Sequence, residues 1–232
     1  MASPAAPIAG VCSMATRHLL AELAVAYEKQ TGQAVTITSA GGADAARRVQ
    51  NHEKFDFVAL AADAIAKLAA DGHVDPASRV DLARSGVAVA VKAGAPHPDL
   101  ASGDTLRQAI LSARKVGYSS GPSGVHLAKL FERWGIAETI KPRLVQAPPG
   151  VPVGTLVGSG EVELGFQQLS ELVGLPDIDI VGALPPDIQV ITVFSAARCR
   201  VSTRPDDVKV LFGFLTRREA DDARRRHGLE PA

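Results

Sequence analysis

The sequence predicts an α/β protein of two Rossmann-like lobes, with a central ligand cleft and two crossover strands that join the lobes. Short β-rich runs alternate with helical patterns along almost the whole chain, which is typical of a mainly parallel sheet covered by helices. Two long β-rich runs, at 86–92 and 188–195, bracket a further stretch of the same alternation. We therefore expect one lobe to be inserted into the other, with lobe 1 formed by 1–88 and 190–232 and lobe 2 by 89–189.

Each expected element has a local signal. β-Branched and apolar clusters predict strands at 7–11, 35–38, 55–60, 84–91, 115–118, 143–146, 162–166, 178–181 and 188–195. Apolar residues at helical spacing predict helices at 13–30, 42–49, 62–70, 105–113, 123–134, 151–158, from near 168, at 205–216 and at 218–227. Gly32 and Gly72 mark helix ends, and Ser13 and Ser123 are each expected to cap the helix that follows.

The composition argues against some classes of partner. Lys+Arg and Asp+Glu balance at 25 each, so no global field attracts nucleic acid or an anionic membrane. No uninterrupted apolar run approaches the ~18 residues of a membrane span. We expect neither nucleic-acid binding nor membrane insertion, and any attraction of an anion must be local.

The N-terminus and the cysteines bear on the compartment. The stretch 1–8, MASPAAPI, lacks the basic start and apolar run of a secretory signal. The sequence as written indicates a cytoplasmic protein, and the alternative is a periplasmic protein whose leader has been removed. Cys12 and Cys199 are too few and too far apart for a disulfide framework or a metal motif, and we expect two buried thiols.

Four loops that follow strands place small or polar residues directly before a helix, at 11–14, 39–43, 119–124 and 149–151. The first N–H groups of a helix have no internal partner and lie at the positive end of its dipole. Any one of these loops is explained by ordinary helix capping. Four together predict an oxyanion site in which several helix starts face one cleft.

The order of elements and the segment FDFVALAAD at 55–63 resemble the type II periplasmic-binding-protein fold, including the molybdate-binding receptors of ABC transporters. Ser13 matches the first binding serine of those receptors. Their serine-rich second turn is replaced here by Gly41-Gly42-Ala43, and their late tyrosine by Phe166-Gln167-Gln168.

Three further segments resemble a subgroup of this fold that includes bacterial aconitate isomerase. They are VDLARSGVAVAVKAGAPHPD at 80–99, GYSSGPSGVHLAKLF at 117–131 and ELGFQQLSE at 163–171. This resemblance implies an isomerase of small polycarboxylates that needs neither a metal nor an organic cofactor. The start of the chain, GVCSMATRH, departs from the serine-glycine-rich turn usual in the subgroup.

The candidate substrate-binding residues are those whose hydroxyl, amide, guanidinium or backbone N–H groups are suited to carboxylates. They are Ser13, Arg17, Ser39, Gly41, Gly42, Arg47, Ser119, Ser120, Ser123, Gly150, Val151 and Gln168. For either arginine the alternative is a solvated residue on a helix face.

Moving the double bond of aconitate needs a group that carries a proton. His126, in the first turn of its helix, is a candidate because imidazole titrates near neutrality, and Tyr118 is a second candidate. His18 is weaker, and a lone histidine is more often structural. The histidines show no metal-ligand spacing.

Two hypotheses follow. The first is an isomerase of polycarboxylates. The second is a receptor that passes molybdate, or another small oxyanion or carboxylate, to the permease of an ABC transporter. A DNA-binding regulator of the same fold is a distant third, because no helix-turn-helix precedes the lobes.

Overall fold

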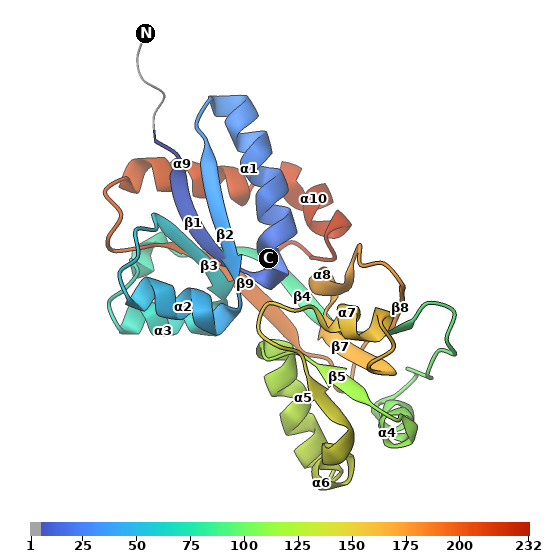
Figure 1. Cartoon of the computed structure of the whole chain (residues 1–232). Helices are drawn as coiled ribbons and strands as arrows, with labels where there is room; N and C mark the ends of the chain where they lie inside the picture. Colours follow the sequence, from blue (N-terminus) through green and yellow to red (C-terminus); the bar gives the residue numbers. More distant parts are fainter. Residues whose placement is uncertain (1–5) are drawn as a thin grey trace. The chain divides into compact units, whose positions relative to one another are not determined.

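The computed structural model describes residues 6–232, and the chain divides into two compact units (Figure 1). Unit 1 comprises Met1–Arg84 and Val193–Ala232, and unit 2 comprises Ser85–Thr192. The first residues of the stretch on which the leader prediction rests lie outside the described part. The predicted cleft between the lobes stays a prediction.

Two strands carry the chain from one unit to the other, namely β4 (Val80–Lys92) and β9 (Ile191–Arg198). β4 begins at Val80, four residues before its predicted start at 84. Where β4 leaves unit 1, Arg84 and Glu230 exchange two backbone hydrogen bonds of 2.8 Å, so the C-terminal residues pair with the strand.

The sheet of unit 1 has the order β2, β1, β3, β9. β1 (Ile8–Ser13) runs parallel to β2 (Val35–Ala40) and to β3 (Phe57–Ala61), whereas β9 is antiparallel to β3. The helical segments of this unit are η1 (Met14–Thr16), α1 (Arg17–Thr31), α2 (Gly42–Gln50), α3 (Ala62–Ala70), η2 (Pro76–Ser78), α9 (Pro205–Leu215), η4 (Arg218–Ala220) and α10 (Asp221–Arg226).

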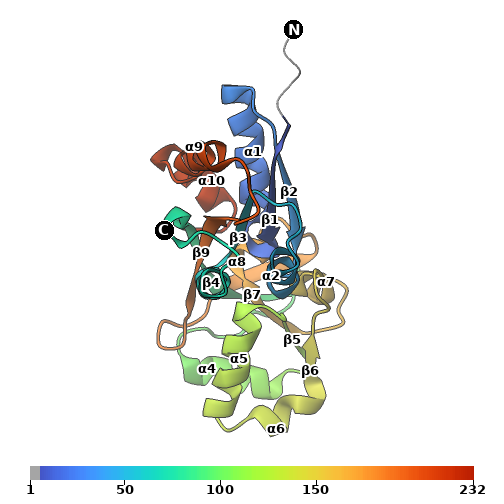
Figure 2. The same ribbon diagram turned by 90° about the vertical axis from the view of Figure 1, so that its left-hand side faces the viewer.

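β3 and most of β1 are buried on both faces of the sheet, which explains their apolar sequences, whereas β2 at the edge of the sheet is only partly buried. Side chains alternate along β3, so Phe57 packs with α1, α9 and α10 while Val58 packs with α2 and α3. Figure 2 shows α9 and α10 beside α1, which they contact. The Phe57 ring also requires glycine at position 10, because a Cβ there would lie 2.3 Å from Cζ of the ring.

Unit 2 has the strand order β4, β7, β5, β6, with β8 (Ile178–Ala183) on the other side of β4. β5 (Val116–Tyr118) is parallel to β6 (Leu144–Gln146) and β7 (Leu164–Gln168), whereas β4 is antiparallel to β7 and β8. Its helical segments are α4 (Gly103–Ser112), α5 (Pro122–Arg133), α6 (Ala137–Ile140), η3 (Lys141–Arg143), α7 (Val153–Gly158) and α8 (Leu169–Leu172).

Local chemistry sets the ends of several helices. α4 starts at Gly103, before its predicted start, because Ser102 and Thr105 form a reciprocal capping box. α1 ends as predicted at Gly32, whose φ of 75° lies in the left-handed region that favours glycine. The short helix α6 was not predicted.

Within residues 6–232, no helix combines the length and apolar character needed to cross a membrane. Cys12 and Cys199 are both buried and unpaired, as predicted. They lie in the two different cores of unit 1, Cys12 on the α1 side and Cys199 on the α2 and α3 side.

Candidate functional site

Three helical segments of unit 1 begin at one edge of its sheet. The register pairs Ser13 with Ala40, and Cys12 with both Ser39 and Ala59, so β1, β2 and β3 end together. The residues that precede η1, α2 and α3 make no side-chain capping bond. The first backbone N–H groups of η1 and α2 are therefore left without a capping side chain, which is the arrangement that attracts an anion, whereas at α3 the Ala64 N–H donates to Asp63 Oδ1.

Ser13 is the buried hydroxyl at this edge. It ends β1 with only 7% of its surface exposed, and its Oγ has no hydrogen-bond partner within the described residues. The sequence predicted a helix cap, and this was wrong, because the Ser13 hydroxyl makes no capping bond. A buried hydroxyl without a partner costs about 1–3 kcal/mol, so this oxygen is suited to an incoming ligand.

Arg17 and Ser39 are brought together on the other face of the sheet. Ser39 pairs with Cys12, so it shares the α1 face and points away from Ser13. A hollow of about 220 Å³ opens there. Its lining residues are Cys12, Arg17, His18, Ala21, Ile37 and Ser39.

The titratable groups that line this hollow are a thiol and an imidazole, both favoured in their neutral forms, and one guanidinium. Burial raises the pKa of the Cys12 thiol to about 12, so the thiol stays protonated. Partial burial lowers the pKa of His18, and the positive charges of Arg17 and His227 lower it further. The Arg17 guanidinium is thus the permanent charge in the lining.

The remaining unit 1 candidates lie on α2. Gly41 precedes the helix and Gly42 begins it, and a Cβ at Gly42 would meet no atom within 4 Å. The backbone there is open to a ligand. Arg47 forms an ion pair with Asp44 on the same helix, and its side chain is 66% exposed. The structure therefore places Arg47 on a solvated helix face.

In unit 2 the serine turn after β5 is tightly packed. Ser119 Oγ and Ser123 Oγ share a buried hydrogen bond of 2.8 Å, and Ser119 Oγ also accepts from the Gly121 N–H. The predicted cap at Ser123 was wrong, because α5 begins at Pro122 and Gly121 occupies the cap position. Ser120 is exposed in the same turn.

Both candidate proton carriers of unit 2 are half-buried. Nε2 of His126 lies 2.9 Å from the Ile188 carbonyl oxygen, which ties the imidazole to the segment before β9. A carbonyl only accepts, so Nε2 carries the hydrogen and only Nδ1 is left to take up a proton. Tyr118 ends β5 and packs against the main core of unit 2.

The other unit 2 candidates follow β6 and β7. Gly150 has a φ of 81°, and Val151 lies in the loop before α7, which starts two residues later than predicted. Gln168 is buried, and its amide oxygen faces Thr192 Oγ1 at 2.8 Å while its nitrogen donates to the Ser85 carbonyl at 3.0 Å. Its amide is engaged between neighbouring strands.

The sequence did not predict one contact between elements of unit 2. Gln167 Oε1 accepts from the Val153 N–H at 2.6 Å, so β7 caps the start of α7. No local pattern marks this contact, because the partners lie on different elements. Ser170, also buried, has an Oγ without a partner in the described residues.

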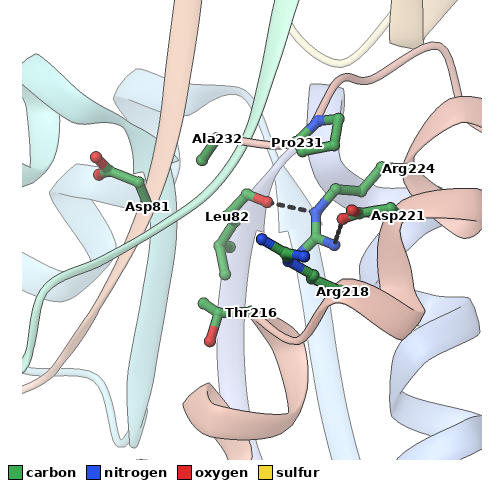
Figure 3. Close-up of a pocket in the computed structure, with 8 residues that line it drawn as sticks. All are labelled: Asp81, Leu82, Thr216, Arg218, Asp221, Arg224, Pro231 and Ala232. Carbon is green, nitrogen blue, oxygen red and sulfur yellow. Dashed lines mark hydrogen bonds and ion pairs between the residues drawn. The ribbon is translucent and has the colours of Figure 1, made fainter.

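A larger hollow in unit 1, of about 480 Å³, is lined by none of the predicted site residues (Figure 3). Its lining includes Arg224, which is nearly fully buried and donates to the carbonyl oxygens of Leu82 and Leu215 and to Asp221. These bonds hold α10 to β4, so the Arg224 guanidinium serves the fold. No cluster of three or more His, Cys, Asp or Glu suited to a metal occurs in the described part of the chain.

The sequence and the fold of this chain are similar to those of known proteins. The aconitate isomerase of Pseudomonas sp is 38% identical, over 99% of this chain and 90% of that protein. The periplasmic molybdate-binding protein of Azotobacter vinelandii superposes with a TM-score of 0.79 at 21% identity, covering 96% of this chain and 98% of that one. Peb3 from Campylobacter jejuni gives 0.69 at 13% identity, with coverage of 97% and 100%.

These structural likenesses confirm the predicted fold class, the type II periplasmic-binding-protein fold, and the resemblance to aconitate isomerase is confirmed over nearly the full length. Residues 8–230 match the profile of a family described as bacterial extracellular solute-binding protein. The chain therefore belongs to the bacterial extracellular solute-binding protein family.

Proposed function

We propose that this protein interconverts cis- and trans-aconitate. The observation that carries the proposal is the 38% identity to an aconitate isomerase across 99% of the chain. The uncapped starts of η1 and α2 and the unpartnered Ser13 hydroxyl support it, because they offer hydrogen-bond donors to carboxylates without a global positive charge.

The reaction is a balanced proton shift. In aconitate a CH₂ and a CH= flank the same central carbon. A base takes a proton from the CH₂, and the C–H electron pair forms a new double bond to the central carbon. The electrons of the old double bond take a proton at the other carbon, which becomes CH₂. No oxidant or reductant is consumed.

We assign binding roles on the contacts of each residue. In unit 1, Ser13 and the N–H groups beginning at Gly42 donate to one carboxylate, and Arg17 holds another. In unit 2, Ser120 is the exposed hydroxyl of the serine turn, and the Ser119–Ser123 bond fixes the shape of that turn. Removing a donor is expected to weaken binding, whereas removing a shaping contact is expected to weaken folding.

Proton NMR of the purified protein with trans-aconitate tests the proposal. New cis-aconitate signals, with deuterium entering the product in D₂O, are expected from an isomerase. A heat-denatured sample is the control for uncatalysed exchange. Binding without any turnover of either isomer would overturn the enzyme and leave a receptor.

The receptor hypothesis is favoured by the likeness to a molybdate-binding protein, which shows the fold alone. Calorimetric titration of molybdate, sulfate, citrate and both aconitates in one buffer separates the two. Tight binding of molybdate with no response to carboxylates would establish a receptor, for which a transporter permease is the expected partner. The family description, extracellular, supports the periplasmic alternative for localisation, and cell fractionation tests it.

A further inference from the structure

The hollow beside α1 contains a histidine whose proton is already assigned by its neighbour. Arg17 Nε donates a hydrogen bond of 3.0 Å to His18 Nε2. A nitrogen that accepts from a guanidinium carries no hydrogen, so neutral His18 has its proton on Nδ1. Nε2 is the basic nitrogen of this ring, and Arg17 covers it.

The groups around His18 keep the ring neutral and oriented. Its ring stacks on that of His227, with centroids 6.1 Å apart and planes 18° from parallel. His227 Nε2 lies 2.8 Å from a carboxylate oxygen of Glu22, and Glu22 is also paired with Arg226. On the sheet side the hollow is lined by the Cys12 thiol, Ile37 and the Ser39 hydroxyl, which bring no charge.

The size of the hollow suits part of a polycarboxylate. About 220 Å³ holds several water molecules at roughly 30 Å³ each, which is room for a carboxymethyl arm. Arg17 and Ser39 line it from α1 and β2, so a carboxylate in the hollow meets a guanidinium and a hydroxyl.

We propose that His18 is the group that removes and returns the proton of the substrate, and that Arg17 controls access to it. This inference rests on the proposed function. When a substrate carboxylate takes the Arg17 guanidinium, the Arg17–His18 hydrogen bond breaks and Nε2 becomes free. The CH₂ of the same arm then loses its proton to Nε2, and the resulting imidazolium returns a proton at the carbon that was CH=.

The same geometry sets His18 apart from His126. Nε2 of His126 is hydrogen-bonded to a backbone carbonyl oxygen. A carboxylate ligand does not compete for that oxygen, because both groups are acceptors. The partner of His18 is an arginine side chain, for which a carboxylate competes directly. We therefore expect substitution by glutamine to slow turnover at His18 but not at His126.

Kinetics and binding of variants test the assignment. His18→Gln is expected to slow isomerisation by about 10²–10⁴-fold, the usual contribution of a proton-transfer group, while citrate affinity changes less than about threefold. His97→Gln, at an exposed histidine of unit 2, is the matched control and is expected to keep wild-type turnover. Circular dichroism confirms that each variant is folded. A His18→Gln variant with wild-type turnover would overturn the proposal, as would a loss confined to His126→Gln.

A second measurement does not depend on activity. Long-range ¹H–¹⁵N NMR of the wild-type protein is expected to show His18 with its hydrogen on Nδ1, and saturating citrate is expected to shift the Nε2 resonance. An Nε2 resonance that ignores citrate, although calorimetry shows citrate bound, contradicts the role of Arg17. If the wild type turns over neither aconitate, the proposed function fails and the proton-transfer role fails with it, whereas active wild type with active His18→Gln sinks only the inference.

Discussion

Two serine-bearing turns, after β1 in unit 1 and after β5 in unit 2, each lead from a parallel strand into a helical segment. In unit 1 the Ser13 hydroxyl is buried without a partner among the described residues. In unit 2 the Ser119 and Ser123 hydroxyls satisfy each other. Similar serine residues therefore have different roles. The Ser13 hydroxyl remains available to bind a ligand, whereas the Ser119 and Ser123 hydroxyls stabilise the conformation of their own turn.

The largest expected effect concerns the glycines of these regions. A Cβ at Gly124 would lie 1.7 Å from the Ser119 carbonyl oxygen, whereas one at Gly42 would meet nothing within 4 Å. Gly124→Ala is expected to lower the free energy of unfolding by about 1–3 kcal/mol or more. Gly42→Ala is expected to change it by less than about 1 kcal/mol. Urea denaturation of both variants measures this, and equal stabilities would show that the unit 2 turn is not tightly packed.

The arginines of unit 1 extend the comparison to ligand binding. Arg17 lines the hollow, while Arg47 is exposed and paired within α2. Arg17→Gln is expected to weaken citrate or aconitate binding by about 10–100-fold, the equivalent of a charged hydrogen bond of about 1.5–3 kcal/mol. Arg47→Gln is expected to stay within about threefold. Calorimetry decides, and a larger loss for Arg47 would place the carboxylate at α2 instead.

Substitution of the serines is expected to have a smaller effect, on stability in the unit 2 turn and on ligand affinity in the unit 1 turn. Ser123→Ala removes one of the two partners of the buried Ser119 hydroxyl and is expected to cost about 1 kcal/mol of stability with affinity unchanged. Ser13→Ala removes a buried hydroxyl that has no protein partner, so stability should hold or rise while affinity falls by about 2–10-fold. Titrations are made at a temperature where both variants are folded. Identical profiles for the two would remove the distinction between the turns.

The smallest expected effect is a pH dependence of stability in unit 1. The hydrogen bonds from Arg226 and His227 hold the pKa of Glu22 below its ordinary value of 4.5. A carboxyl with a lowered folded-state pKa stabilises the fold above the unfolded value and loses that contribution as the pH falls through the folded value. Unfolding free energies measured from pH 6 downwards should therefore fall less steeply in Glu22→Gln than in the wild type below about pH 4.5, and parallel curves would contradict this.

Local patterns predicted most strands and helices to within a few residues, because each has its own apolar periodicity or glycine end, as at Gly32. They failed where the deciding contact is distant in sequence. Ser123 is a local exception: it does not cap its helix because α5 already begins at Pro122, and its hydroxyl bonds to that of Ser119 four residues away. Gln167 caps α7 from another element, and His126 is held by a carbonyl 62 residues away. Sheet register, rather than residue type, places Ser39 with Arg17 and apart from Ser13.

The discontinuous chain of unit 1 has a consequence for its biosynthesis. Unit 2 is one uninterrupted segment, whereas the core beside α1 needs Phe194 from β9 and Val208, Leu211 and Phe212 from α9. At about 5–20 residues per second a ribosome takes several seconds to add the segment from Val193 to Ala232. Until then the apolar face of α1 has no complete partner, so this core can close only after the whole of unit 2 has been synthesised.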